Sequence, residues 1–176
     1  MKKAKKFISL FITICLLMTF VPMQMVYADS AFSGGNGTMD DPYLITSAND
    51  FKQLATEVNG GNNYSNTYFK IPETVTETIE LSTDDGYVPI GNDTNQFEGT
   101  FDGGNHTINL NLTGERLVGL FGEGGENSNL CNIRTTGSVS MTGYYAGGIV
   151  ANMYGNVVNC HNEASVTGYY HVGGIV

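Results

Sequence analysis

The chain has 176 residues, of which 17 are acidic and eight are lysine or arginine, and its formal net charge is −9 at pH 7. Because so acidic a surface cannot neutralise phosphate, this balance excludes nucleic acid and anionic lipid as partners. Regularly spaced apolar residues also exclude an acidic disordered chain.

Residues 1–28 are typical of a secretory signal peptide. A basic start is followed by the apolar run Phe7–Val21 and by Ala28 at a suitable cleavage position. An uncleaved membrane anchor is the alternative, but polar residues and a proline interrupt the run. We therefore expect a secreted or cell-surface protein that has no membrane contact after cleavage. Residues 29–176 then keep four basic residues against 17 acidic ones, a net charge of −13.

Residues 29–96 are predicted to form an N-terminal cap and the first irregular coils. A strand is expected over Tyr43–Thr46, and a helix follows from Ser47, where Asp50 completes a capping box. Apolar residues recur at helical spacing, and the helix is expected to end at Asn59: Phe51, Leu54, Ala55, Val58. We expect this helix to cover the open end of a sheet. Three further short strands are predicted over Tyr68–Ile71, Thr74–Leu81 and Tyr87–Gly91, and Thr74–Leu81 is rich in β-branched residues.

The stretch Phe97–Leu112 alternates between apolar and polar residues. Ile108, Leu110 and Leu112 mark the buried face of a strand. Before it, Phe97, Gly99 and Phe101 form a shorter alternating run. The four residues between the two runs tolerate positive φ angles and predict a tight structural turn: Asp102, Gly103, Gly104 and Asn105.

Residues 97–176 repeat. Thr-Gly pairs begin at Thr113, Thr142 and Thr167, at intervals of 29 and 25 residues, and Asn129–Ile133 aligns with Asn156–Cys160 at 27 residues. A period of this length with glycine turns predicts an all-β parallel solenoid with one coil per repeat. The spaced leucines of a leucine-rich repeat are missing. Because the last repeat stops within its core, we expect a C-terminally incomplete solenoid, with further repeats or domains of the same chain beyond Val176.

These motifs together resemble secreted bacterial proteins with GLUG-type repeats. The stretch Phe97–Ile108 is similar to their F-x-G-T-F-D-G-x-G-H-T-I segment, although Asn105 stands where the family often has glycine. The segments Gly119–Gly122, Gly148–Ala151 and Gly174–Val176 resemble their G-[LI]-[VF]-G core. The resemblance implies a right-handed parallel β-helix of adhesin-like type and supplies no catalytic residues, because the family motif is structural.

Asp102 and His106 are the residues most suggestive of chemistry. An acid–base pair needs further partners at hydrogen-bond distance, and no second acid is identifiable near them. Turn formation explains both residues, so we expect no catalytic group within this chain. His161 and His171 fall at different repeat positions, and the acidic pairs occur in loops, so no metal and no cofactor is expected.

Two tyrosine pairs provide the binding hypothesis. Since neighbouring residues of a strand face opposite sides, one ring of each pair is expected to face outward and to stack on its counterpart in the next coil: Tyr144, Tyr145, Tyr169 and Tyr170. Such a ladder suits a glycan or an extracellular protein partner. The alternative is that the ladder only stabilises the stack.

The aligned repeats place Cys131 opposite Val158 and Cys160 opposite Ile133. The two cysteines are therefore not equivalent, and a disulfide between them is the less favoured prediction. Asn132 and Asn159 do align, which predicts an asparagine ladder along one corner.

Two functions follow from the sequence. The first is an exported, non-catalytic solenoid for surface adhesion or scaffolding. The second is the N-terminal accessory part of a larger extracellular peptidase or polysaccharide-degrading enzyme whose catalytic unit lies beyond Val176. A downstream wall anchor would favour the first function, and a downstream catalytic motif would favour the second.

Overall fold

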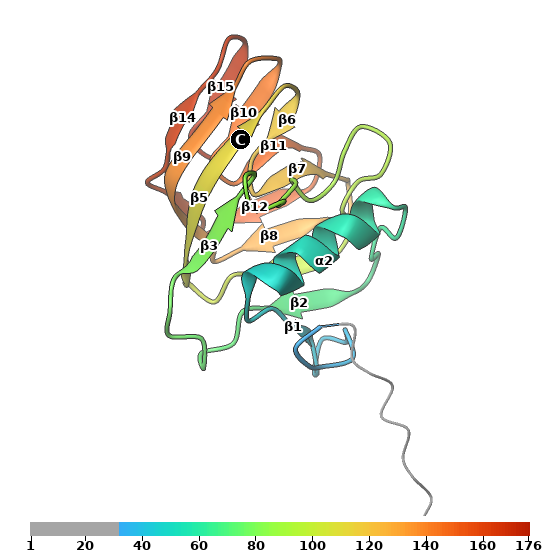
Figure 1. Ribbon diagram of the computed structural model, residues 1–176. Coiled ribbons are helices and arrows are strands. Elements are labelled where there is room, and N and C mark those ends of the chain that lie inside the picture. The colour runs from blue at the N-terminus through green and yellow to red at the C-terminus, as the bar shows by residue number, and fades with distance from the viewer. Residues whose placement is uncertain (1–31) are drawn as a thin grey trace, which may run out of the picture.

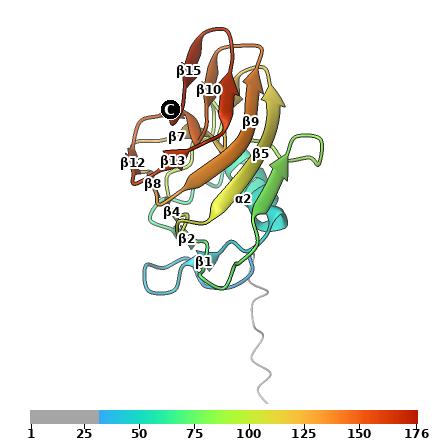
Figure 2. The ribbon, with the colours of Figure 1, turned by 90° about the vertical axis from the view of Figure 1, so that its left-hand side faces the viewer.

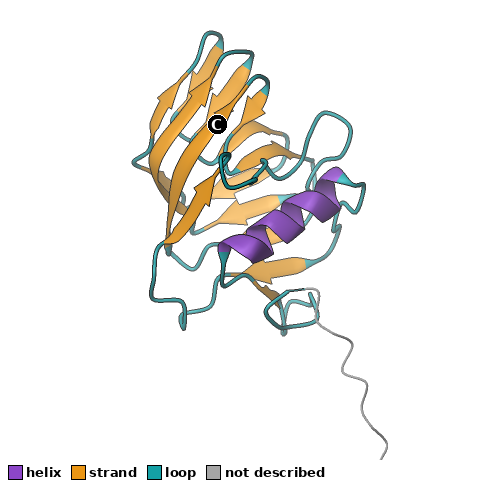
Figure 3. Cartoon of the chain, viewed as in Figure 1, coloured by secondary structure: helices purple, strands orange, loops and turns teal. Residues whose placement is uncertain are grey.

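The computed structural model describes residues 32–176, and the predicted signal peptide lies outside them. Within these residues the chain winds through parallel stacked turns and forms a β-solenoid (Figure 1). Helix α2 (Ala48–Asn59) accompanies many short strands, as Figure 3 shows. The predicted all-β solenoid with a short N-terminal helix is thus confirmed.

The strands are short, and most sheets gain one strand per turn. In chain order they are β1 (Tyr43–Leu44), β2 (Tyr68–Lys70), β3 (Ile79–Ser82), β4 (Thr100–Asp102), β5 (Thr107–Gly114), β6 (Leu117–Val118), β7 (Phe121–Gly124), β8 (Asn129–Cys131), β9 (Arg134–Met141), β10 (Tyr145–Gly147), β11 (Val150–Met153), β12 (Asn156–Val158), β13 (His161–Asn162), β14 (Ser165–Thr167) and β15 (His171–Gly173).

Four parallel sheets form the walls of the solenoid. Sheet A has the order β1-β2-β4-β8-β12, and sheet B has the order β13-β9-β5-β3 with β14 also on β9. Sheet C pairs β7 with β11, and sheet D has the order β15-β10-β6. The long strands β5 and β9 of sheet B lie side by side in Figure 2. From β4 to β12 the chain passes through the sheets in the order A, B, D and C.

The register confirms one of the two repeat alignments and corrects the other. Asn129 pairs with Asn156 in sheet A, as the 27-residue alignment predicts. The Thr-Gly alignment is wrong, because Thr113 pairs with Ser140 and Ser140 pairs with Thr167 in sheet B. Thr113 and Thr167 thus occupy equivalent positions, whereas Thr142 lies two residues beyond Ser140, because the connections from sheet B to sheet D differ in length between turns.

The strand predicted over Thr74–Leu81 is shorter than expected. Strand β3 begins only at Ile79, where pairing with Ile108 of β5 starts. Before it, the Val75 amide donates to the Pro72 carbonyl in a turn. Residues 72–78 carry the chain from sheet A to sheet B, so their β-branched residues have no neighbouring strand with which to pair.

Helix α2 closes the core at the N-terminal end of the stack. The Ser47 hydroxyl accepts from the Asp50 amide, and the Asp50 carboxylate accepts from the Ser47 amide, which is the predicted capping box. Four apolar side chains of its inner face are fully buried: Phe51, Leu54, Ala55 and Val58. In the first turn, α2 comes after β1 at the place in the chain where β3 comes after β2 in the next turn. The helix contacts β3, the edge strand of sheet B.

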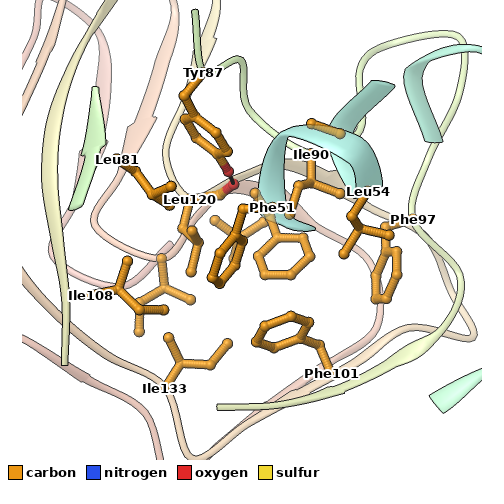
Figure 4. Packing of buried hydrophobic residues seen from close by; sticks show 14 of the residues in the cluster. Phe51, Leu54, Leu81, Tyr87, Ile90, Phe97, Phe101, Ile108, Leu120 and Ile133 are labelled. Atoms are coloured by element: carbon orange, nitrogen blue, oxygen red, sulfur yellow. Dashed lines mark hydrogen bonds between the residues drawn. The ribbon is translucent and has the colours of Figure 1, made fainter. Parts of the chain in front are cut away.

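Aromatic rings connect successive turns inside the solenoid (Figure 4). The Phe101 ring lies 5.6 Å from Phe51 and 5.4 Å from Phe121, and Phe97 lies 5.3 Å from Phe121, measured between ring centroids. The buried Tyr87 hydroxyl donates to the Leu120 carbonyl at 2.5 Å, so its polar atom is satisfied. Burial raises the pKa of Tyr87. This core leaves the outer faces of the sheets as the surfaces available for function.

Candidate functional site

The corner between β4 and β5 is built on the Asp102 carboxylate. Its Oδ1 atom accepts from the Gly104 amide at 2.9 Å and from Asn132 Nδ2 at 2.8 Å. Asn132 Oδ1 in turn accepts from Asn159 Nδ2 at 2.6 Å. The predicted asparagine ladder is therefore present, and it begins at an aspartate one turn earlier.

The backbone of this corner requires unusual residues. Asn105, Asn132 and Asn159 have φ angles of 61°, 53° and 52°, a region that asparagine tolerates better than most residues. Gly104 has a φ of 58°, and a Cβ atom on it would lie 2.6 Å from the Ile71 carbonyl oxygen. Gly103 is buried at the same corner. Asp102, Gly103, Gly104 and Asn105 therefore have a structural role, which is to form the tight turn between β4 and β5.

His106 does not form a pair with Asp102. Its Nε2 atom is buried and has no hydrogen-bond partner in the described part of the chain. The interactions of Asp102 Oδ1 are with Gly104 and Asn132 instead. The geometry thus provides no proton relay at this turn.

The four predicted tyrosines lie together on the loops and strands that lead into sheet D, but in a different register from the one expected. Tyr144 stacks on Tyr170 at a centroid distance of 5.6 Å and an interplanar angle of 16°. Tyr145 stacks on His171 at 4.8 Å and 13°, and it pairs with His171 in the sheet. The expectation that Tyr144 lies over Tyr169 and Tyr145 over Tyr170 is wrong, because the last connection to sheet D is one residue shorter.

Both members of each tyrosine pair are exposed, whereas only one was expected to face outward. The exposed fractions are 59% for Tyr144, 37% for Tyr145, 79% for Tyr169 and 69% for Tyr170. The reason is that Tyr144, Tyr169 and Tyr170 belong to loops, where strand alternation does not apply. We define the aromatic surface as these four tyrosines together with His171, which the Thr-Gly alignment does not place beside Tyr145.

Both described cysteines are free thiols, and they occupy the predicted non-equivalent positions. Cys131 pairs with Val158 in sheet A, and the Cys160 thiol contacts the Val158 carbonyl at 3.4 Å. Burial, followed by the nearby charges of Asp102 and Cys160, raises the pKa of Cys131 to about 11. Burial also raises the pKa of Cys160. Raised values make both thiols poor nucleophiles at neutral pH.

Two further features concern metal binding and membrane spanning in residues 32–176. No group of three His, Cys, Asp or Glu side chains gathers there as a metal site would require. None of the helices in this part of the chain is long and apolar enough to cross a bilayer.

Two known proteins are similar to this chain over most of its length. A protein named "Putative Gly-rich membrane protein" from Evansella cellulosilytica is 32% identical over 165 residues, which cover 89% of this chain and 18% of that protein. Halomucin from Haloquadratum walsbyi is 36% identical over 151 residues, which cover 81% of this chain and 2% of halomucin. No protein-family model and no solved structure matches the chain. The chain therefore corresponds to less than a fifth of the length of either relative.

Proposed function

We propose that this protein is an exported, non-catalytic solenoid module of the GLUG-repeat type, which adheres to an extracellular glycan through the aromatic surface. The observation that carries the proposal is the exposure of four tyrosines in one place, two of them stacked ring on ring across neighbouring turns. Flat rings with hydroxyl groups suit the apolar faces and polar edges of sugars.

The exposure of the rings favours binding over a purely structural ladder. A stacked aromatic pair contributes about 0.5–1.5 kcal/mol beyond its buried area. Tyr144 stacks on Tyr170 of the following turn and is nevertheless 59% exposed, so its outer face remains accessible to a partner.

The relatives support a modular role. Each is more than five times longer than the segment that it shares with this chain, which is the relation expected of a module within a large extracellular protein. The name of the first relative favours a surface location for this chain as well. The alternative, an accessory part of an extracellular enzyme, is compatible with the same lengths, and the catalytic unit would then lie outside these residues.

The proposal is tested by sedimentation with insoluble glycans. Wild-type protein lacking residues 1–28 and the Tyr144→Ser/Tyr170→Ser variant are mixed with cellulose, chitin or bacterial peptidoglycan, and the unbound fraction is measured. Tyr154→Ser is the matched control, because Tyr154 is 58% exposed and stacks on no ring in the described part of the chain.

We expect the wild type and the control to bind one of these polymers and the double variant to bind it at least tenfold more weakly, with an unchanged circular dichroism spectrum. Equal binding by the folded double variant would contradict the assignment of the aromatic surface. Failure of the wild type to bind any of the three polymers would contradict the proposal that the ligand is a glycan.

A further inference from the structure

A concave surface lies on the outer face of sheet A. A pocket of about 580 Å³ is lined by side chains of β2, β4 and β8 and by residues of the loop before β1. Figure 1 shows these strands in the lower part of the molecule, away from β10 and β15, and Figure 2 agrees. We call this pocket the sheet-A groove; the aromatic surface is not part of it.

Strand register arranges the polar side chains of the groove in two rows. Tyr68, Thr100 and Asn129 are neighbours in one row, and Lys70, Asp102 and Cys131 are neighbours in the other. The residues between the rows point inward and are buried: Phe69, Phe101 and Leu130. Neighbouring strands lie about 4.8 Å apart, and alternate residues of one strand about 6.6 Å apart, so the rows form a fixed lattice of polar groups.

Most polar side chains of the groove have no partner within the described part of the chain. Tyr68, Lys70 and Thr100 are half-buried and form no side-chain hydrogen bond or ion pair there, and the same holds for Asn129. Asp102 is different, because its Oδ1 atom is held by Asn132 and Gly104 while its Oδ2 atom accepts no bond. The groove therefore offers donors and an acceptor that rigid strands hold in place.

The charges of the groove favour a neutral, polyhydroxylated ligand. Lys70 and Asp102 are register neighbours on adjacent strands, so a cation and an anion are offered side by side, and Asp40 adds a second anion to the lining. A sugar hydroxyl can accept a hydrogen bond from the Lys70 ammonium group and donate one to the Asp102 carboxylate. An uncharged ligand can therefore satisfy both charged side chains. The net charge of −9 over the whole chain further disfavours an acidic polymer.

We propose that the sheet-A groove binds a short neutral oligosaccharide, independently of the aromatic surface. Lys70 and Asn129 donate to sugar oxygens, Asp102 accepts through Oδ2, and Tyr68 supplies a ring edge and a hydroxyl group. The pocket volume lies in the range of small-ligand sites.

Nuclear magnetic resonance titration with defined oligosaccharides tests this proposal. Cellohexaose and chitohexaose are the neutral probes, and hexagalacturonate is the acidic probe. The variant is Lys70→Met, which keeps the length of the side chain and removes its charge. Lys52→Met is the matched control, because Lys52 lies on α2 and contacts the Asp85 carbonyl instead.

We expect a neutral hexasaccharide to shift the amide signals of Lys70, Thr100 and Asn129, with a dissociation constant below 1 mM. Lys70→Met should weaken this binding at least tenfold, and Lys52→Met and Tyr144→Ser/Tyr170→Ser should leave it unchanged. The proposal is overturned if neither neutral probe shifts these signals, if hexagalacturonate binds more tightly, or if Lys70→Met binds as the wild type does. Loss of binding in the tyrosine variant alone would show that the sugar binds to the aromatic surface, and it would overturn the proposal that the sheet-A groove is the binding site.

Discussion

The Asp102 carboxylate joins two turns of the solenoid at one corner, since it accepts from its own turn through Gly104 and from the next turn through Asn132. An aspartate beside a glycine turn and a histidine invites a catalytic interpretation. Its hydrogen bonds show that the side chain supplies the acceptor on which the asparagine ladder begins, although its backbone pairs with Cys131.

Replacing Asp102 with alanine should therefore destabilise the fold. Asn132 Nδ2 and the Gly104 amide would lose their acceptor, at a cost of about 1–3 kcal/mol. Chemical denaturation measures the loss, with Asp84→Ala as the control because the Asp84 side chain accepts no hydrogen bond in residues 32–176. If Asp102→Ala lowers the free energy of unfolding no more than Asp84→Ala does, Asp102 does not stabilise the corner.

Asp50 makes the stability of the helix N-terminus depend on pH. Burial raises its pKa, but hydrogen bonds from the Thr46 amide and from the Ser33, Ser47 and Thr46 hydroxyls outweigh burial, so the pKa lies below its ordinary value. A lowered carboxyl pKa contributes stability above the unfolded value, and this contribution is lost as the pH falls through the folded value.

Asp50→Asn should cost about 1–2 kcal/mol at pH 7, and the difference from the wild type should shrink below about pH 4. Urea denaturation from pH 7 to pH 3 measures this difference, with Asp85→Asn as the control. A difference that stays constant over this range would show that the Asp50 charge does not contribute.

The cysteines allow a chemical test of burial. Because the pKa of Cys131 is raised to about 11, alkylation of the folded protein at pH 8 should be roughly a hundredfold slower than alkylation of the unfolded protein. Iodoacetamide labelling followed by mass spectrometry measures both rates and should find two free thiols per unfolded chain without residues 1–28. Finding none would reveal a Cys131–Cys160 disulfide, and equal rates would contradict the burial of Cys131.

Helix α2 is the element that closes the core, and its contribution resides in one face. Phe51 packs on Phe101, and Leu54 and Val58 are fully buried beside it. At the other side of the helix, Thr56 is exposed. The helix is thus comparable to the terminal cap of a repeat protein, which shields the first turn from solvent.

Phe51→Ala should accordingly destabilise the protein by about 3–5 kcal/mol, because it removes a ring from a packed core. Thr56→Ala, on the exposed face, should change stability by less than about 0.5 kcal/mol. Thermal unfolding followed by circular dichroism compares the two. Similar small effects of both substitutions would mean that the helix docks on the solenoid without sealing it.

The molecule as a whole shows which features could be predicted from sequence. The capping box at Ser47 and the alternation of Ile108, Leu110 and Leu112 are local signals, and both elements were predicted correctly. The 27-residue period was visible because Asn129 and Asn156 occupy equivalent positions at the start of β8 and β12. Each of these features depends on residues close in sequence or on a repeat of constant length.

The features that were missed depend on how one turn lies on the next. The stacking of Tyr144 on Tyr170 required the length of the connection from sheet B to sheet D, which a shared Thr-Gly motif does not reveal. The sheet-A groove joins Tyr68, Thr100 and Asn129, which are about 30 residues apart and meet only through strand register. No single segment carries a signal for either.

The proposed function requires direct contact between sugar and the exposed tyrosines. Protein with ¹³C-labelled tyrosine rings can be titrated with a soluble form of the glycan that the wild type retains in sedimentation. We predict that the ring signals of Tyr144, Tyr145, Tyr169 and Tyr170 shift on binding, while the signal of the buried Tyr87 does not. Saturating binding that leaves all four of these signals unchanged would contradict the function proposed for the aromatic surface.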